Sequence, residues 1–554
     1  MTNVSLPSAA TENRRPVTLQ TAYRRTLSAL VALGAALRVW QYLADMSMWF
    51  DEFSIARNIG ERSFVQLLTQ PLAYEQTAPL GFLAAVDIAK RLFGTSDMSL
   101  RLFPFLCGIA ALFVFRRLAE RALVGVAIPI AVGLFALSPP LIRYSAELKQ
   151  YGGDVLVTSL LMLVALELCA REPTRRGCLV AGAVGVVTVL FSQAAVLVLT
   201  GLGAALFVRW LFERTDTTRA PVLVTVPIWA CAAIGGLLVA RLYMTAHTMA
   251  FMHDFWRSRQ GFLPLPPSAA ATMLWTRDRL LQFFDAMSLY PIPVLYSVLA
   301  LAGFVALWRR RDVALILAGP LAVTFAAAVA QQYPFRMRLV LFLLPTLLLT
   351  SAASVGWVVD RVTAMNPAAG LAMGIAALLP PAMAIVLAPP PYVVEPFKPI
   401  LAYVQAHRQP GDRIYVYANA YMAITRYGPL YGMPLGNYVT GACDDSLFAP
   451  FYADVDRFRG APRVWIIGSS VPDFRPARMA LRKYLGAIGV KRDSLVRRSV
   501  PPMDPVSAEL YDLSDSARLR SATATTFHVE PDPVLHALCY DWVRPTGVPG
   551  ELPH

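Results

Sequence analysis

Residues 76–121 read QTAPLGFLAAVDIAKRLFGTSDMSLRLFPFLCGIAALFVFRRLAER, and they place two kinds of apolar segment next to each other. The first, 79–93, carries three charged residues among its apolar ones, and such charges are costly in the middle of a bilayer. The second, 98–115, is predominantly apolar and close to the ~20 residues that cross a bilayer. The stretch therefore predicts a helix along the membrane surface followed by a helix that spans the membrane.

The first segment has the pattern of an amphipathic helix, with apolar residues on one face and charges on the other. The apolar face consists of Phe82, Leu83, Val86, Ala89 and Phe93, and the charges opposite are Asp87, Lys90 and Arg91. A second surface helix is expected over 52–69, with Phe53, Ala56 and Ile59 turned inward. The first outer loop, about 46–97, is thus expected to be helical along the membrane surface.

The composition extends this interpretation to the whole chain. Of 554 residues, 56% are hydrophobic and 16% are charged, and the mean hydropathy is +0.50. Soluble domains carry about a quarter charged residues, so the chain is expected to be an α-helical polytopic membrane protein. The net charge of +14 could also suit nucleic acid, but no basic patch interleaved with aromatic residues supports such a partner.

Eleven membrane spans are expected, which puts the two termini on opposite sides. They are placed at about 26–45, 98–115, 123–140, 152–170, 178–192, 194–208, 221–241, 290–308, 313–330, 338–357 and 368–388. The run 26–45 is interpreted as a retained span, because it is long for a signal peptide and shows no small-residue cleavage site. The pair 178–208 is short and could instead be a tilted or re-entrant hairpin.

The distribution of arginine supports this topology, because Lys and Arg collect in cytoplasmic loops. Arginines fall in each segment expected to be cytoplasmic: Arg14, Arg15, Arg24 and Arg25; Arg116, Arg117 and Arg121; Arg171, Arg175 and Arg176; Arg209, Arg214 and Arg219; Arg309, Arg310 and Arg311; and Arg361. The loops 46–97 and 242–289 and the tail from about 389 are then on the outer face.

Three regions follow: a cytoplasmic N-terminal segment (1–25), a membrane domain (26–388) and an outer C-terminal domain (389–554). The last begins with the Pro-rich hinge APPPYVVEPFKP, 388–399. DRIYVYA (412–418) and RVWIIG (463–468) predict buried strands, and PARMALRKYLGAIG (476–489) predicts a helix. The domain is expected to be a soluble α/β module, in which Cys443 and Cys539 form a disulfide or remain two free thiols.

Residues 48–59, MWFDEFSIARNI, put two adjacent carboxylates, Asp51 and Glu52, at the edge of the membrane. They could be solvated charges at the start of a surface helix. Two other stretches on the same side favour a functional site. LSPPLIRYSAELKQYGGD (137–154) gathers many ionisable groups in a short turn, and QQYPFRMRLV (331–340) places two arginines on the outer face, against the trend.

The order and sidedness of these motifs resemble the GT-C glycosyltransferases, specifically the branch with protein O-mannosyltransferases and lipid A aminoarabinose transferases. The resemblance covers 40–170 most clearly. WFDEFSIARNI resembles the acidic motif of the first outer loop, and 76–121 resembles the surface helix, LFG turn and second span. Residues 137–154 resemble the start of the fourth span, and YPFRMRLVLFLLP resembles a later Arg-containing segment. The family often has a His-Pro-Pro-like or Lys-Pro stretch where this chain has Gln76-Thr77-Ala78-Pro79, so no contact is carried over there.

The resemblance implies a GT-C fold and transfer of a sugar from a polyprenyl-phosphate donor to an envelope acceptor (a protein, lipid or polysaccharide) on the periplasmic side of a bacterial inner membrane. Asp51 is the expected base, with Glu52 orienting the acceptor or the neighbours of Asp51. The expected ligands of the donor phosphate are Arg57, Lys149, Arg336 and Arg338. The expected contacts to substrate, or to Lys149, are Glu147, Tyr151, Asp154 and Tyr333.

The partners expected are therefore the lipid-linked donor, the acceptor and membrane lipids. No cofactor is expected: the histidines show no tight ligand spacing, so a divalent metal is possible in this family but unsupported here. Two other classes of protein remain open, a transporter or flippase of a lipid-linked sugar and an inactive homologue that only binds one. The absence of a two-fold hydropathy repeat disfavours the transporter.

Overall fold

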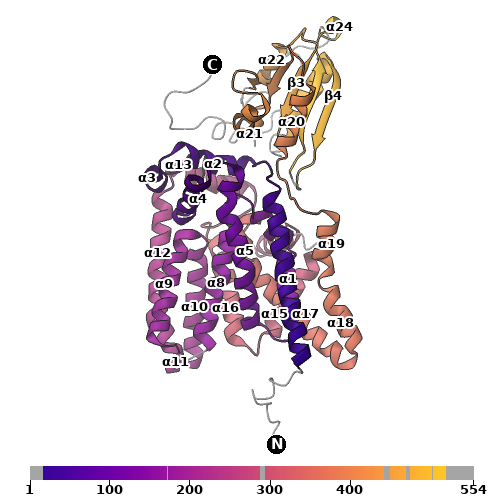
Figure 1. Ribbon diagram of the computed structural model, residues 1–554. Helices are drawn as coiled ribbons and strands as arrows, with labels where there is room; N and C mark the ends of the chain where they lie inside the picture. Colours follow the sequence, from indigo (N-terminus) through magenta and orange to yellow (C-terminus); the bar gives the residue numbers. More distant parts are fainter. Residues whose placement is uncertain are drawn as a thin grey trace, which may run out of the picture.

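The computed structural model describes residues 17–170, 173–286, 293–441, 449–469, 475–501 and 503–519. A bundle of long helices forms one part of the molecule, and a smaller domain with a sheet sits at one end of it (Figure 1). The helices α2, α3, α4 and α13 lie across the end of the bundle nearest the sheet, and α1 begins at the opposite end. The expected division into a helical membrane part and an α/β part is confirmed, whereas the domain boundaries given above remain predictions.

A helix occupies each of the eleven segments expected to span the membrane. These helices are α1 (Val17–Leu43), α5 (Asp97–Ala122), α6 (Ala127–Ala136), α8 (Tyr151–Ala170), α9 (Arg175–Phe191), α10 (Ala195–Glu213), α12 (Val226–Leu242), α15 (Pro293–Ala306), α16 (Arg311–Val329), α17 (Leu344–Met365), and the pair α18 (Pro367–Ala376) with α19 (Leu379–Leu387). The short α11 (Asp216–Ala220) and the π-helical turn Pro221–Thr225 lead into α12, and the 3₁₀ turn Met337–Leu343 leads into α17.

Not all of these helices could cross a bilayer alone. Within the described ranges, seven are long and apolar enough, or eight if α18 and α19, bent by 41°, form one span. The helices α6 and α15 have only 10 and 14 residues. The protein is thus polytopic, while the number eleven stays a prediction. The run Met337–Met365 is the most enclosed of the seven, with 89% of its apolar window buried, so α17 lies at the centre of the bundle.

The loop 46–97 is helical, as expected, although the single helix expected over 52–69 is two helices, α2 and α3. This loop contains α2 (Phe50–Glu61), α3 (Phe64–Thr69) and α4 (Leu80–Phe93), and α7 (Pro139–Tyr144) and α13 (Ala246–Ser258) with α14 (Ala269–Ala286) follow in later loops. Phe53, Ala56 and Ile59 are buried, which confirms the inward face of α2.

The expected faces of α4 are wrong at two positions. Asp87 is fully buried, because its carboxylate lies 2.6 Å from both Lys90 Nζ and Arg91 Nε and is neutralised by them. Phe93 is 64% exposed, at the last residue of the helix, where it falls outside the packed face.

The C-terminal domain has a five-stranded sheet in the order β2-β1-β3-β5-β4. Its strands are β1 (Arg413–Val416), β2 (Val439–Thr440), β3 (Val464–Gly468), β4 (Val490–Arg497) and β5 (Val506–Asp512). The pairs β1–β2 and β1–β3 are parallel, and β5 runs antiparallel to both β3 and β4. The helices are α20 (Phe397–His407), α21 (Tyr421–Tyr427), α22 (Ala449–Asp456), α23 (Arg475–Ile488) and α24 (Ser516–Leu519).

Both predicted strands and the predicted helix of this domain are present, and β3 is buried along its whole length. The apolar core of the domain is continuous with that of the surface helices, since Phe53 of α2 packs edge-on against Tyr427 of α21 with ring centroids 5.6 Å apart. The Tyr427 hydroxyl also accepts a hydrogen bond from the Met48 backbone N–H at 2.7 Å. These contacts hold the domain against the loop that carries Asp51. Cys443 and Cys539 lie outside the described residues.

Candidate active site

Asp51 lies in the first turn of α2, where a negative charge is favourable beside the helix N-terminus. Its Oδ2 accepts a hydrogen bond from Arg338 Nη2 at 2.6 Å, and Lys149 Nζ lies 3.8 Å from its Oδ1. The Asp51 side chain is 13% exposed, so it remains within reach of a ligand. The structure therefore joins three residues from three distant segments into one cluster, which we call the Asp51 centre (Asp51, Lys149 and Arg338).

The charges of this centre determine the protonation state of the carboxylate. Burial would raise the pKa of Asp51, but the positive charges of Lys149 and Arg338 outweigh it and hold the pKa below its usual value. Burial lowers the pKa of Lys149, although the facing carboxylate of Asp51 opposes this change. Asp51 is therefore a carboxylate at neutral pH, balanced by two cations.

Arg338 is held in place by aromatic residues as well as by Asp51. Its Nε donates to the Tyr151 hydroxyl at 3.1 Å, and its guanidinium carbon lies 5.2 Å from the ring centroid of Trp49 and 5.8 Å from that of Trp256. Tyr151 begins α8 close to α7, which Gly152 allows: a Cβ there would lie 2.9 Å from the Tyr144 carbonyl oxygen.

Glu52 is fully buried and has a different environment from Asp51. Both of its oxygens pair with Arg101, at 2.7 Å to Nε and 2.6 Å to Nη2, and Oε1 also accepts from the Leu148 backbone N–H at 2.7 Å. The residue next to Leu148 is Lys149. Glu52 thus fixes the position of Leu148, next to Lys149, and is too buried to contact an acceptor.

The segment that precedes α8 supplies further polar groups. Lys149 Nζ donates to Gln76 Oε1 at 2.6 Å, so Gln76, at the position where the family pattern is broken, orients the lysine. Glu147 is buried beside Arg143, with 3.3 Å between Oε2 and Nε, and its Oε1 has no hydrogen-bond partner. Burial raises the pKa of Glu147.

Four other predicted site residues are not brought into the Asp51 centre. Arg57 pairs with Glu61 at 2.9 Å and lies over the Tyr74 ring. Asp154 accepts from Ser192 Oγ at 2.6 Å, between α8 and α10, and the Tyr333 hydroxyl donates to the Leu339 carbonyl at 2.7 Å. Arg336, two residues from Arg338, shares none of the partners of Arg338 among the described residues.

Sequence reasoning missed Gln76, Arg101 and Trp256 as neighbours of the site. Arg101 carried a usable signal, because a cation inside an expected span is a hint of function by default. Gln76 stood out only as a departure from the family pattern, and Trp256 carried no signal, since a single indole in such a loop is ordinary.

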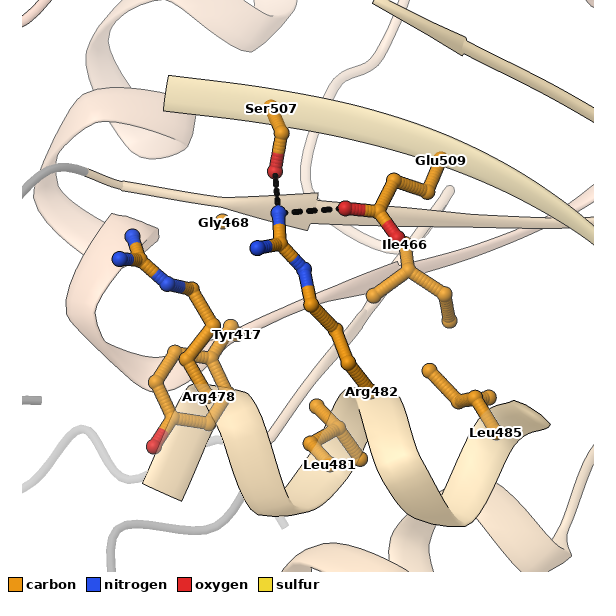
Figure 2. A pocket seen from close by; sticks show the side chains of 9 residues that line it. All are labelled: Tyr417, Ile466, Gly468, Arg478, Leu481, Arg482, Leu485, Ser507 and Glu509. Carbon is orange, nitrogen blue, oxygen red and sulfur yellow. Dashed lines mark hydrogen bonds and ion pairs between the residues drawn. The ribbon is translucent and has the colours of Figure 1, made fainter. Parts of the chain in front are cut away.

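No group of three or more His, Cys, Asp or Glu residues that could hold a metal ion occurs in the described part of the chain. The expectation that no metal is required stays a prediction. In the described part of the α/β domain, a small pocket lies between α23 and the sheet, lined in part by Arg478, Arg482 and Tyr417 (Figure 2). Its arginines are already paired: Arg482 Nη2 lies 2.5 Å from Glu509 and 2.9 Å from Ser507.

Several solved structures are similar to this chain. The oligosaccharyltransferase of Archaeoglobus fulgidus in its apo form matches with 12% identity over 91% of this chain and 76% of that one, at a TM-score of 0.48. ArnT from Cupriavidus metallidurans in the apo state matches with 12% identity over 89% and 98%, at 0.43. Arabinofuranosyltransferase AftD from Mycobacteria matches with 16% identity over 89% and 40%, at 0.40.

All three are GT-C glycosyltransferases, the superfamily that the sequence motifs resemble. ArnT is also solved with undecaprenyl phosphate, and the archaeal enzyme with a dolichol-phosphate and an inhibitory peptide. No protein-family model and no curated protein sequence matches the chain. At identities of 12–16% and TM-scores below 0.5, the chemistry has to be inferred from the residues of this chain.

Proposed function

We propose that the protein is a membrane glycosyltransferase that moves a sugar from a polyprenyl-phosphate donor to an acceptor of the cell envelope. The observation that carries the proposal is the Asp51 centre: an accessible carboxylate with Arg338 at 2.6 Å and Lys149 at 3.8 Å. One carboxylate beside two cations supplies a base for a hydroxyl group and positive charge for a departing phosphate. A donor with a lipid tail presents its head group at the membrane surface, where α2 lies.

In the proposed reaction the acceptor hydroxyl attacks the anomeric carbon while Asp51 takes its proton. The bond between that carbon and the phosphate oxygen breaks, and the polyprenyl phosphate leaves with the electron pair. Attack from the face opposite the phosphate inverts the anomeric carbon. Lys149 and Arg338 are the residues proposed to stabilise the negative charge that develops on the phosphate.

The charges of the Asp51 centre give a reason why Asp51 would act as a base only after the donor is bound. With the site empty, Arg338 and Lys149 keep the pKa of Asp51 low and make it a weak base. A donor phosphate would compete for both cations, weaken their hold on the carboxylate and so raise its basicity once the donor is bound. The Tyr151 hydroxyl, which accepts a hydrogen bond from Arg338, is proposed to contact the sugar.

The proposed setting is a bacterial inner membrane, with the Asp51 centre and the α/β domain on the periplasmic side and the N-terminus in the cytoplasm. The acceptor could be a protein, a lipid or a polysaccharide, and the sugar a hexose or a pentose. Glu52 is proposed to position α2 and the segment before α8, and not to touch substrate.

The test is sugar transfer from a panel of radiolabelled polyprenyl-phosphate sugars to crude envelope, with purified protein and the Asp51→Asn variant. We expect the variant to lose about 10²–10⁴-fold in rate, the usual contribution of a general base. Asp254→Asn is the matched control, because Asp254 is a carboxylate of the same outer face that is 80% exposed. Equal transfer by Asp51→Asn would remove Asp51 from the reaction, and no transfer by the intact protein from any donor would favour a transporter or flippase.

A further inference from the structure

Two helices that meet where the α/β domain joins the first outer loop cap each other's N-termini. Glu395 precedes α20, and its Oε2 accepts a hydrogen bond from the backbone N–H of Phe50, the first residue of α2, at 3.1 Å. In return, Ser47 precedes α2, and its Oγ accepts from the first two N–H groups of α20, those of Phe397 at 3.0 Å and Lys398 at 2.8 Å. The N–H groups at a helix start lack partners within the helix, so each helix completes the other.

Glu395 is anchored in the sheet of the α/β domain. It is 1% exposed, and its Oε1 is hydrogen-bonded to Ser469 Oγ at the end of β3. The Ser469 carbonyl is fixed in turn, because it accepts from Arg478 Nη1 of α23 at 2.7 Å. The helix that follows Glu395, α20, packs against β4 and β5 of the same sheet. One buried side chain therefore connects the sheet to the Phe50 N–H.

Ser47, on the other side of this exchange, belongs to the same short segment as Asp51. Its carbonyl oxygen accepts from Arg101 Nη2 at 3.2 Å, and the same nitrogen lies 2.6 Å from Glu52 Oε2. Asp51 directly follows Phe50, the residue whose N–H Glu395 binds. The α/β domain thus holds this segment at both caps, and Arg101 holds it from the side of α5.

Other bonds attach the domain to the bundle without involving Glu395. Asp97, in the first turn of α5, pairs with Arg426 at 2.6 Å and with Lys398 at 3.1 Å. It also accepts a hydrogen bond from the Tyr427 hydroxyl. These bonds end on α5, so they hold the domain in place without capping α2. Loss of the Glu395 carboxyl group is therefore expected to leave the domain attached and to free the first turn of α2.

We propose that Glu395 is a positioning residue of the transferase, which holds the first turn of α2, and with it Asp51, in a fixed place relative to the α/β domain. This inference rests on the proposed function and gives the domain a part in the reaction, although no described residue of the domain belongs to the Asp51 centre. A general base must lie within hydrogen-bond reach of the proton that it takes, and small displacements are costly. Displacement of α2 should therefore slow the chemical step. Lys149 and Arg338 stand on other segments and should still bind the donor.

The first test compares Glu395→Met, which has no oxygen for the Phe50 N–H, with Glu395→Gln, which has one and can also donate to Ser469. Transfer by the full-length protein is measured over a range of concentrations of the polyprenyl-phosphate sugar that the donor panel selects. Glu395→Met should lose about tenfold or more in kcat, while KM for the donor stays within about twofold. Glu395→Gln should keep the natural rate. A natural rate in Glu395→Met, or an equal loss in both variants, would overturn the proposal.

Gln41→Met is the matched control for a general loosening of the hinge. Gln41, on α1, is 2% exposed and exchanges two hydrogen bonds with the backbone of Tyr392, at 2.8 and 3.2 Å. Like Glu395→Met, this variant removes buried hydrogen bonds between the bundle and the hinge, but they end on α1. Its melting temperature should fall by a similar amount, and its kcat should not change. If Gln41→Met slows transfer as much as Glu395→Met does, the proposal fails.

Hydrogen exchange separates this proposal from the proposed function. The backbone amides of residues 48–61 should exchange about fivefold faster in Glu395→Met, the change expected from the loss of one helix cap, and at the natural rate in Gln41→Met. If the intact protein transfers no sugar but shows this difference, the proposed function fails and the link between the domain and α2 stands. Transfer by the intact protein without this difference in exchange would refute the link alone. If Glu395→Met does not fold, Ser469→Ala, which removes the anchor of Glu395, decides by the same two measurements.

Discussion

The α/β domain and the loop before α15 both bury arginines, but they balance the charge in different ways. In the domain, Arg478 is 8% exposed and lies 2.5 Å from Asp504. Arg482 lies 2.5 Å from Glu509, a contact that Figure 2 marks with a dashed line. In the loop, Arg279 is still more buried and has only the amide oxygen of Gln260. The first arrangement is complete and therefore structural, whereas in the second Arg279 has no ion pair with any residue that the structure describes.

The Asp51 centre lies between these two extremes. It sets one carboxylate against two cations, so that a net positive charge remains after Asp51 is paired. The adjacent residue Glu52 shows the balanced case within the same helix, since Arg101 satisfies both of its oxygens. Asp51 and Glu52 thus have different environments, because Asp51 faces two cations and Glu52 faces one.

The largest loss of stability is expected where a buried ion pair loses its carboxylate. Glu52→Gln would leave Arg101 buried without a counter-charge, at a cost of about 3–5 kcal/mol in the free energy of unfolding. Transfer would fall as well, because Leu148 and Lys149 would lose their anchor. Chemical unfolding and the transfer assay measure the two effects. Glu61→Gln, with a carboxylate on the same helix that is 50% exposed, is the control, and a Glu52→Gln protein as stable as this control would refute the structural role of the pair.

The next loss of stability is expected in the α/β domain, at the pair of Arg478 with Asp504. Asp504→Asn should destabilise the protein by about 3 kcal/mol, because Arg478 would keep its burial and lose its charge partner. Thermal unfolding of the full chain should show this loss, and Asp515→Asn, at a pair that is 48% exposed on both sides, should not. If Asp504→Asn and Arg279→Gln change stability equally, paired and unpaired buried arginines do not differ in their energetic cost.

Much of the fold followed from local patterns, because apolar length and period are properties of single segments. All eleven apolar segments are helices, and 412–418 and 463–468 contain strands. Of the predicted site, Asp51, Lys149, Tyr151 and Arg338 come together, and the expected topology had put their segments on one side of the membrane. The sequence motifs could therefore indicate which segments meet, although 287 positions separate Arg338 from Asp51.

These local patterns could not predict which side chains pair with each other. Glu52 was expected to orient either the acceptor or the neighbours of Asp51, and nothing near it in the sequence revealed that Arg101 would pair with it. Arg57 was expected to bind phosphate, but Glu61, one helical turn away, pairs with it. The sequence did not mark Arg279 as unusual, because an arginine in a polar loop is ordinary unless it is known to be buried.

Glu395, in the segment before α20, carries the opposite charge type to Arg279. It is a buried carboxyl group that pairs with no cation among the described residues. Its Oε2 accepts from the Phe50 backbone N–H at 3.1 Å, at the start of α2, and its Oε1 is hydrogen-bonded to Ser469 at the end of β3. Burial raises the pKa of Glu395 to about 8. A carboxyl group can avoid an unbalanced charge by keeping its proton, whereas an arginine at neutral pH keeps its charge.

The remaining effect is one of pH, and it is spread over several pH units. Because the pKa of Glu395 is raised by folding, its contribution to stability is complete below about 4.5, the value of an unperturbed glutamate, and is lost as the pH rises through about 8. The melting temperature should fall over that window by about 5 °C or less for each pKa unit realised. Glu395→Gln, which cannot ionise, should flatten this part of the profile and leave stability at pH 5 nearly unchanged. A profile with the same slope in the variant would show that the hinge carboxyl is not the group that titrates, and that its contacts to α2 and β3 persist when it is charged.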